Sequence, residues 1–241
     1  PFLSFVLLAK PFWQPEQLQA DLKRDWQIEA QTVPTAEGNS LVWEQDGMLV
    51  AVSLMPGPVP NEEAVQAAAN NQNWPDAVAV SQNHQAHLLV AVMPREEEPT
   101  VAGQLFVKVC DACLQQKNAL AIYTLGTVME PKFYHQAAAM MQKGDLPILN
   151  WVYFGLYENE QGMNGYTYGL YQFDQDEIEI IGSQHNPQEI CNLLFDLSYY
   201  VLDGNITLQG GETIDLSTEQ KLAITRSEGV AVEGESLKIE F

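Results

Sequence analysis

The chain has 241 residues, 46% of them hydrophobic and 10% aromatic, and carries a formal net charge of -21. This apolar and aromatic content is sufficient for a buried core, so the composition excludes a disordered chain. Nucleic acid and anionic membranes would be repelled by the charge, so we expect neither as a partner; a basic protein is favoured instead.

Two long stretches, residues 25–94 and 144–220, contain neither lysine nor arginine. The second stretch holds thirteen acidic residues, and it also contains aromatic segments that are typical of a folded region. The basic residues are confined to the N-terminal edge, to residues 95–143 and to the end of the chain. This distribution predicts a bipolar surface on a folded protein.

Hydrophobic periodicity predicts alternating strands and helices in the first half of the chain. The apolar run at residues 3–9 is typical of a buried strand, and Leu18, Leu22 and Trp26 share one face of a helix. Asp46-Gly47 marks a hairpin turn. The predicted elements are a strand at 3–9, a helix at 15–26, strands at 41–44 and 48–54, a helix from residue 61, and strands at 77–80 and 86–92.

A charged segment at residues 95–99 separates this half from the next. Beyond it, long aromatic runs favour strands, and Asn186-Pro187-Gln188-Glu189 is typical of a helix start. The predicted elements are helices at 101–115, 131–142 and 186–201, strands at 120–125, 148–157, 166–173 and 177–181, a loop at 158–165, and short final strands.

The order of elements in the first half is βαββαββ, close to the ferredoxin-like split βαβ arrangement, and the second half follows a similar order. We therefore predict an α+β fold with two ferredoxin-like subdomains packed side by side. The first would occupy residues 1–98 and the second residues 99–241.

Several segments of the second half resemble a known family. They are residues 167–173, 177–180, 187–189, 194–200, 211–214 and 221–227. Together they are similar to the domain of unknown function 4261 family over roughly residues 144–227. The resemblance implies a bacterial intracellular protein of uncharacterised role, and it does not identify an active site.

The N-terminal apolar run is shorter than the roughly 20 residues of a membrane span. It also lacks a basic flank and a cleavage site, so we expect a cytoplasmic protein. Cys110, Cys113 and Cys191 are odd in number and too few for a disulfide framework, which agrees with a reducing compartment.

Two pairs of residues, one of cysteines and one of histidines, have spacings that occur in metal sites, but neither pair is predicted to bind a metal. Cys110 and Cys113 lie in a helical pattern without a second pair of ligands, so we predict buried structural cysteines. His84 and His87 lie at the turn and start of a strand, where their spacing points them to opposite faces. We expect a solvated His84 and a half-buried His87, with no metal and no cofactor.

The set of residues that most resembles an enzyme active site consists of Glu130, Tyr134 and His135. It follows a strand and a glycine turn and begins a helix at Pro131, where backbone N-H groups can hold an anion and His135 can act as a general base. These three residues are the candidate catalytic residues. A candidate pocket between the subdomains would be lined by Tyr134, His135, Trp151 and Tyr153.

Three functions remain open. The leading hypothesis is a non-enzymatic, acidic protein-binding module for a basic protein, such as an immunity or accessory factor for a secreted bacterial effector. The first alternative is an enzyme or small-molecule sensor that uses the pocket between the subdomains. The second alternative is a structural module that forms a homodimer.

Overall fold

A computed structural model describes residues 1–31, 38–215 and 221–241. The chain divides into two compact units, Pro1–Asn150 and Trp151–Phe241, called the first and second unit below. Each unit contains its own sheet together with helices, so the fold is α+β as predicted. Parts of the two base-free stretches, residues 32–37 and 216–220, lie outside the described residues.

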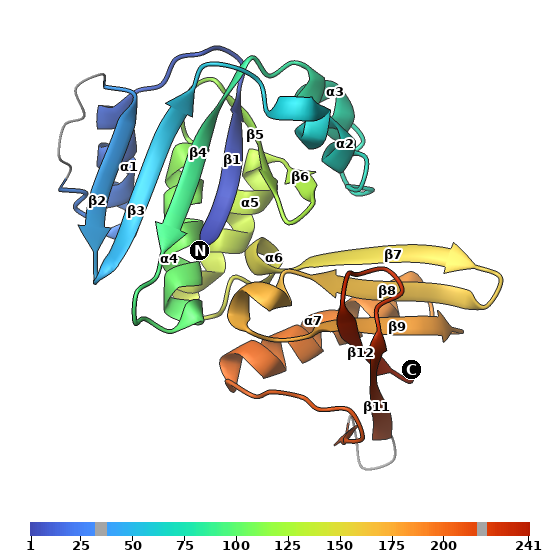
Figure 1. Cartoon of the computed structure of the whole chain (residues 1–241). Helices are drawn as coiled ribbons and strands as arrows, with labels where there is room; N and C mark the ends of the chain where they lie inside the picture. The colour runs from blue at the N-terminus through green and yellow to red at the C-terminus, as the bar shows by residue number, and fades with distance from the viewer. Residues whose placement is uncertain (32–37, 216–220) are drawn as a thin grey trace. The chain divides into compact units, whose positions relative to one another are not determined.

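The first unit is built on a six-stranded antiparallel sheet with the strand order β2-β3-β4-β1-β5-β6 (Figure 1). Its strands are β1 (Phe2–Leu8), β2 (Ser40–Gln45), β3 (Met48–Met55), β4 (Ala86–Met93), β5 (Ala119–Thr124) and β6 (Thr127–Met129). Its helical segments are α1 (Pro15–Trp26), η1 (Pro60–Glu62), α2 (Glu63–Ala68), α3 (Ala77–Gln82), α4 (Pro99–Cys113), α5 (Pro131–Ala138), η2 (Ala139–Lys143) and the start of α6 (Ile148–Trp151).

The core of the first unit lies between this sheet and helix α4, which contacts β1 and β4 and is flanked by α1 and α5. Alternation along β4 shows which face is covered, because Leu88, Val90 and Val92 are fully buried while Leu89 and Met93 are partly exposed. On the opposite face, α2 and α3 cover only the region of β1, β5 and β6. Elsewhere on that face, Leu3, Met55 and Met93 are exposed among the described residues.

The second unit also contains a six-stranded sheet, with the order β10-β11-β12-β9-β8-β7. Its strands are β7 (Tyr153–Asn159), β8 (Gly162–Tyr168), β9 (Glu177–Ser183), β10 (Thr213–Asp215), β11 (Lys221–Glu228) and β12 (Glu235–Ile239), and its helical segments are η3 (Leu170–Phe173) and α7 (Pro187–Asp203). Strands β7, β8 and β9 are sequential neighbours, and β12 pairs with β9 in parallel.

Helix α7 packs on β7 and β8. It begins with a capping box, in which the Asn186 side chain accepts a hydrogen bond from the Glu189 N-H and the Glu189 carboxylate accepts one from the Asn186 N-H. Gly165 of β8 allows the helix to approach closely, because a Cβ atom there would lie 2.5 Å from a side-chain carbon of Ile190. Within the described residues, none of the helices is both long and apolar enough to cross a membrane.

Several predicted elements differ from the structure. Residues 77–80 form helix α3 instead of a strand, because a four-residue apolar run fits a buried helix equally well and Ala77 packs in the cluster of α2. The strand predicted at 148–157 begins only at Tyr153, after α6. The predicted loop at 158–165 is a tight hairpin, in which Asn159 pairs with Gly162.

The division between the units also differs from the predicted boundary at residues 98 and 99. Strands β5 and β6 extend the first sheet, so the first unit continues to Asn150. In the second unit, the sequential order of β7, β8 and β9 differs from a split βαβ arrangement, in which another strand would lie between two of them.

Two acidic side chains of β9 are buried and hold neighbouring loops. Glu177 accepts hydrogen bonds from the Thr167 hydroxyl at 2.6 Å and from the Gly169 N-H at 2.7 Å. Glu179 accepts from the Ser236 hydroxyl and the Ala231 N-H, both at 2.6 Å. Burial raises the pKa of Glu177 in spite of these donors. Burial would also raise the pKa of Glu179, but its hydrogen bonds, including one from Lys238, hold that pKa below its usual value.

We expect the substitution Glu179→Ala to lower the free energy of unfolding by about 3 kcal/mol or more, because it leaves the buried donors without their acceptor. The difference from the wild type should shrink as the pH falls from 4.5 through the lower pKa of the folded protein, since protons then bind the unfolded chain first and the folded carboxylate last. Urea unfolding between pH 3 and 7 measures both effects. The exposed Glu228→Ala variant is the control, and an equal loss in both variants would contradict the assigned role.

Candidate functional site

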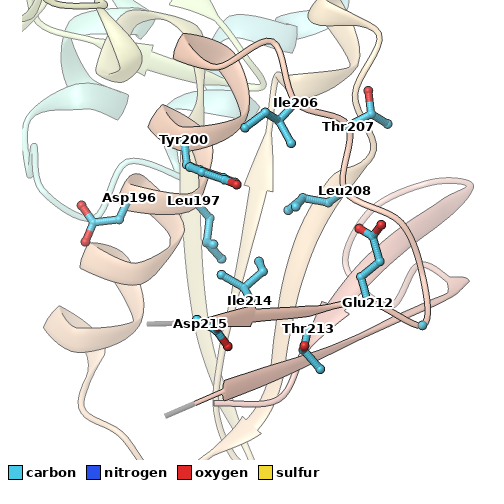
Figure 2. Close-up of a pocket in the computed structure, with 11 residues that line it drawn as sticks. Asp196, Leu197, Tyr200, Ile206, Thr207, Leu208, Glu212, Thr213, Ile214 and Asp215 are labelled. Atoms are coloured by element: carbon cyan, nitrogen blue, oxygen red, sulfur yellow. The ribbon is translucent and has the colours of Figure 1, made fainter. Parts of the chain in front are cut away.

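The second unit contains an open cleft of about 900 Å³ between helix α7 and the segment that follows it. Figure 2 shows Leu197 and Tyr200 of the helix facing Ile206, Leu208 and Ile214. All of the lining residues belong to the second unit. They are Asp196, Leu197, Tyr200, Ile206, Thr207, Leu208, Gly211, Glu212, Thr213, Ile214 and Asp215.

The floor of the cleft is apolar. Leu197 and Leu208 are buried, while Ile206 and Ile214 are partly exposed. Tyr200 stands at the rim and remains 50% exposed. Such a floor can bury aliphatic side chains of a ligand, and the tyrosine ring can also contact a cation.

The rim carries three exposed carboxylates, Asp196, Glu212 and Asp215. Asp196 lies on the helix side of the cleft and Glu212 on the loop side (Figure 2). Glu212 accepts a hydrogen bond from the Gln209 N-H at 2.9 Å, which fixes its position in the loop. Asp215 lies 3.5 Å from the Lys221 ammonium, a contact that is exposed on both sides and therefore weak.

The basic side chains of the second unit form ion pairs with acidic residues of the same unit. Residues 151–241 contain sixteen acidic residues and three basic ones. Lys221 pairs with Asp215, Arg226 with Asp176 and Glu235, and Lys238 with Glu179. The rim carboxylates therefore belong to a strongly acidic surface, and they suit a cationic ligand.

The cleft also borders a free sheet edge. In the described part of the chain, β10 is the last strand of its sheet and pairs only with β11, in a register that joins Ile214 to Leu222. Three of the lining residues, Thr213, Ile214 and Asp215, form this strand. A free edge presents unpaired backbone N-H and C=O groups to a ligand.

The candidate catalytic residues lie in the first unit, where α5 brings His135 to α4. The His135 Nδ1 atom lies 2.8 Å from the Asp111 carboxylate, and the Trp26 indole donates to the same carboxylate at 3.1 Å. Asp111 is fully buried, which raises its pKa, although both donors oppose that shift. The half-exposed imidazole can thus act as a base that a buried carboxylate orients.

The rest of this predicted group is arranged differently. The partner of His135 is Asp111 and not Glu130, which occupies the N-cap position of α5. Tyr134 is fully buried, and its hydroxyl lies beside Cys110. Asp111 was not among the predicted site residues, although an acidic residue inside the apolar stripe of α4 is a sequence signal for it.

The predicted pocket residues are divided between the units. Tyr134 and His135 belong to the first unit, while Trp151 and Tyr153 belong to the second. Trp151 is buried against Phe173, with ring centroids 4.8 Å apart, and burial raises the pKa of Tyr153 to about 12. A pocket shared by all four residues stays a prediction.

The expectation of a solvated His84 was wrong, because both histidines are buried and hold the segment after β3. His84 Nε2 accepts a hydrogen bond from the Val59 N-H at 2.9 Å, and its Nδ1 atom contacts the Ser81 carbonyl. His87 Nδ1 lies 2.9 Å from the Gly57 carbonyl. Burial lowers the pKa of His87, and the proximity of His84 adds to this.

Cys110 and Cys113 are buried free thiols, as predicted, and burial raises the pKa of both. Thiols with a raised pKa are poor nucleophiles and poor metal ligands. In the described ranges, no three His, Cys, Asp or Glu side chains are grouped closely enough to hold a metal ion.

The fold and the cleft define an acidic α+β protein with two sheets. The family described as "Domain of unknown function (DUF4261)" matches residues 166–240, which confirms the resemblance expected for the C-terminal part of the chain. The matched region contains the whole cleft. Searches of curated proteins and of solved structures found no match.

The buried histidines lead to a pH prediction. Because the pKa of His87 is lower in the folded protein than the ordinary value of 6.5, its contribution to stability is complete above pH 6.5 and is lost as the pH falls through the folded pKa. We expect the free energy of unfolding to decrease across this range. His87→Gln, which can still donate to Gly57, should reduce the slope measured by urea unfolding. An unchanged slope would contradict this assignment.

Proposed function

We propose that this chain is a non-enzymatic cytoplasmic binding protein that engages a basic protein through the acidic surface of its second unit. Its role would be that of an immunity or accessory factor for a secreted bacterial effector. The observation that carries the proposal is the charge balance of residues 151–241, in which three basic side chains are all paired internally among sixteen acidic residues.

Electrostatics explains why such a surface favours a basic partner. Opposite charge accelerates association, and like charge suppresses wrong partners. The surface is displayed on a rigid sheet and helix, so its charges keep fixed positions relative to one another. We also propose a ferredoxin-like core for the first unit, which is supported by the interleaved order of β3, β4, β1 and β5.

The test is co-purification with the full chain as bait, starting at about 0.1 M salt. Raising the salt to about 1 M shortens the Debye length from about 10 Å to about 3 Å. We expect the retained proteins to be basic and to elute within this range. Retention of no basic protein, or binding that salt does not change, would refute the proposal.

A homodimer is the second candidate, favoured by an apolar patch on the open face of the first sheet. Leu3, Met55 and Met93 are 51%, 40% and 38% exposed, and register places Leu49 beside Met93 on the same face. Glu44 and Arg95 form an ion pair near this patch, with its oxygen and nitrogen 3.4 Å apart. Because Glu44 and Arg95 carry opposite charges, the edge of this patch is complementary to the same edge of a second copy related by a two-fold axis.

If this face forms a dimer, light scattering will give twice the chain mass of 26.9 kDa. The double substitution Leu49→Glu and Met93→Glu should return the monomer, because it places charges in an apolar interface. Val101→Glu, at another exposed apolar position, should leave the mass unchanged. A wild-type monomer at high protein concentration would exclude this candidate.

A further inference from the structure

The cleft of the second unit has three properties that together specify a type of ligand. It has an apolar floor, an acidic rim and a free strand edge along one side. We propose that it binds an extended, basic segment of the partner, which adds to the edge of β10 as a new strand. This inference rests on the proposed function, since it assigns the basic partner to one place on the surface.

Strand addition follows from the position of β10. Its backbone pairs with β11 on one side, and within the described residues no strand pairs with its other side. A peptide that runs beside β10 can therefore form main-chain hydrogen bonds without displacing any existing strand. At about 3.4 Å per residue, the three residues of β10 offer roughly 10 Å of edge, which suits a paired segment of about three residues.

The side chains of such a segment would alternate between two environments. In a strand, successive side chains point to opposite faces, so every second one would point toward the floor formed by Leu197, Leu208 and Ile214. These positions favour aliphatic residues. The intervening side chains would lie on the face of Asp215, the neighbour of Ile214 along β10, where lysine or arginine is favoured.

The remaining rim groups add to the preference for positive charge. Asp196 on the helix side and Glu212 on the loop side both add negative charge to the surroundings of a bound segment (Figure 2). The exposed ring of Tyr200 can accept a cation on its face. The expected ligand is therefore a short segment with alternating aliphatic and basic residues.

The test begins with a displayed library of random ten-residue peptides, selected against the immobilised full chain at about 0.1 M salt. We expect the enriched peptides to be basic, with apolar residues at every second position. Synthetic copies of these peptides then serve as probes in fluorescence anisotropy titrations.

Matched variants locate the binding site. The triple variant Asp196→Asn, Glu212→Gln and Asp215→Asn removes the rim charges while nearly keeping the side-chain shapes. Its control, Glu158→Gln, Glu160→Gln and Glu233→Gln, removes the same charge from exposed positions outside the cleft. We expect the rim variant to weaken binding by about tenfold or more and the control by less than about threefold. Circular dichroism verifies that both variants are folded.

N-methylation of the peptide tests strand addition itself. Methyl groups on one alternate set of amides would block the hydrogen bonds to β10, while the other set points away from that edge. Binding should be lost with one set and kept with the other. Loss with both sets, or enriched peptides with apolar residues at a helical period, would overturn strand addition.

The outcomes separate this inference from the proposed function. If basic peptides bind the rim variant and its control equally well, the cleft is not the site, although the proposed function stands. If no peptide is enriched, the cleft inference fails, and the co-purification experiment alone decides the proposed function. If the enriched peptides show no preference for basic residues, both proposals fail.

Discussion

The shortage of basic side chains is the constraint on which the rest of this structure depends. The chain has eleven lysine and arginine residues and thirty-two acidic ones, so most carboxylates have no cationic partner available. Two of the buried carboxylates, Glu177 and Asp111, take their described hydrogen bonds from groups other than lysine and arginine. Glu177 accepts from a hydroxyl and from backbone N-H groups, and Asp111 accepts from an indole and an imidazole. Because these donors sit on other elements, Glu177 and Asp111 each fix a tertiary contact that a solvated ion pair would not fix.

The same shortage determines what the surface can do. In the second unit, Lys221, Arg226 and Lys238 are each used in an internal pair, which leaves most of the exposed acidic residues without a basic partner in this unit. Such a surface repels like charge, and this self-repulsion weakens the compact state. Binding of a basic partner would relieve that repulsion. Stability and binding are therefore coupled through the same carboxylates.

Sequence patterns predicted the elements that carry strong local signals. Helix α1 was predicted at its observed bounds, and the start of α7 was recognised from Asn186 and Pro187, whose capping interaction is local. Elements decided by tertiary contacts were not predictable. Residues 77–80 have no periodicity that separates a helix from a strand, and the buried position of His84 depends on a segment 25 residues earlier in the chain. The cleft was missed because its residues carry no motif and are brought together only by the return of the chain from α7 to β10.

The width of the second sheet explains why this cleft exists. A helix with its side chains is about 10 Å wide, and neighbouring strands are about 4.8 Å apart, so one helix covers roughly two strands. Helix α7 is the long helix of this unit, and its main sheet contacts are with β7 and β8, at one end of a six-stranded sheet. The opposite end, at β10, is therefore not covered by the body of the helix; Leu197 and Tyr200 of α7 line the cleft there together with Ile206 and Leu208. A partner strand at β10 would bury apolar surface that the chain's own helix is too narrow to cover.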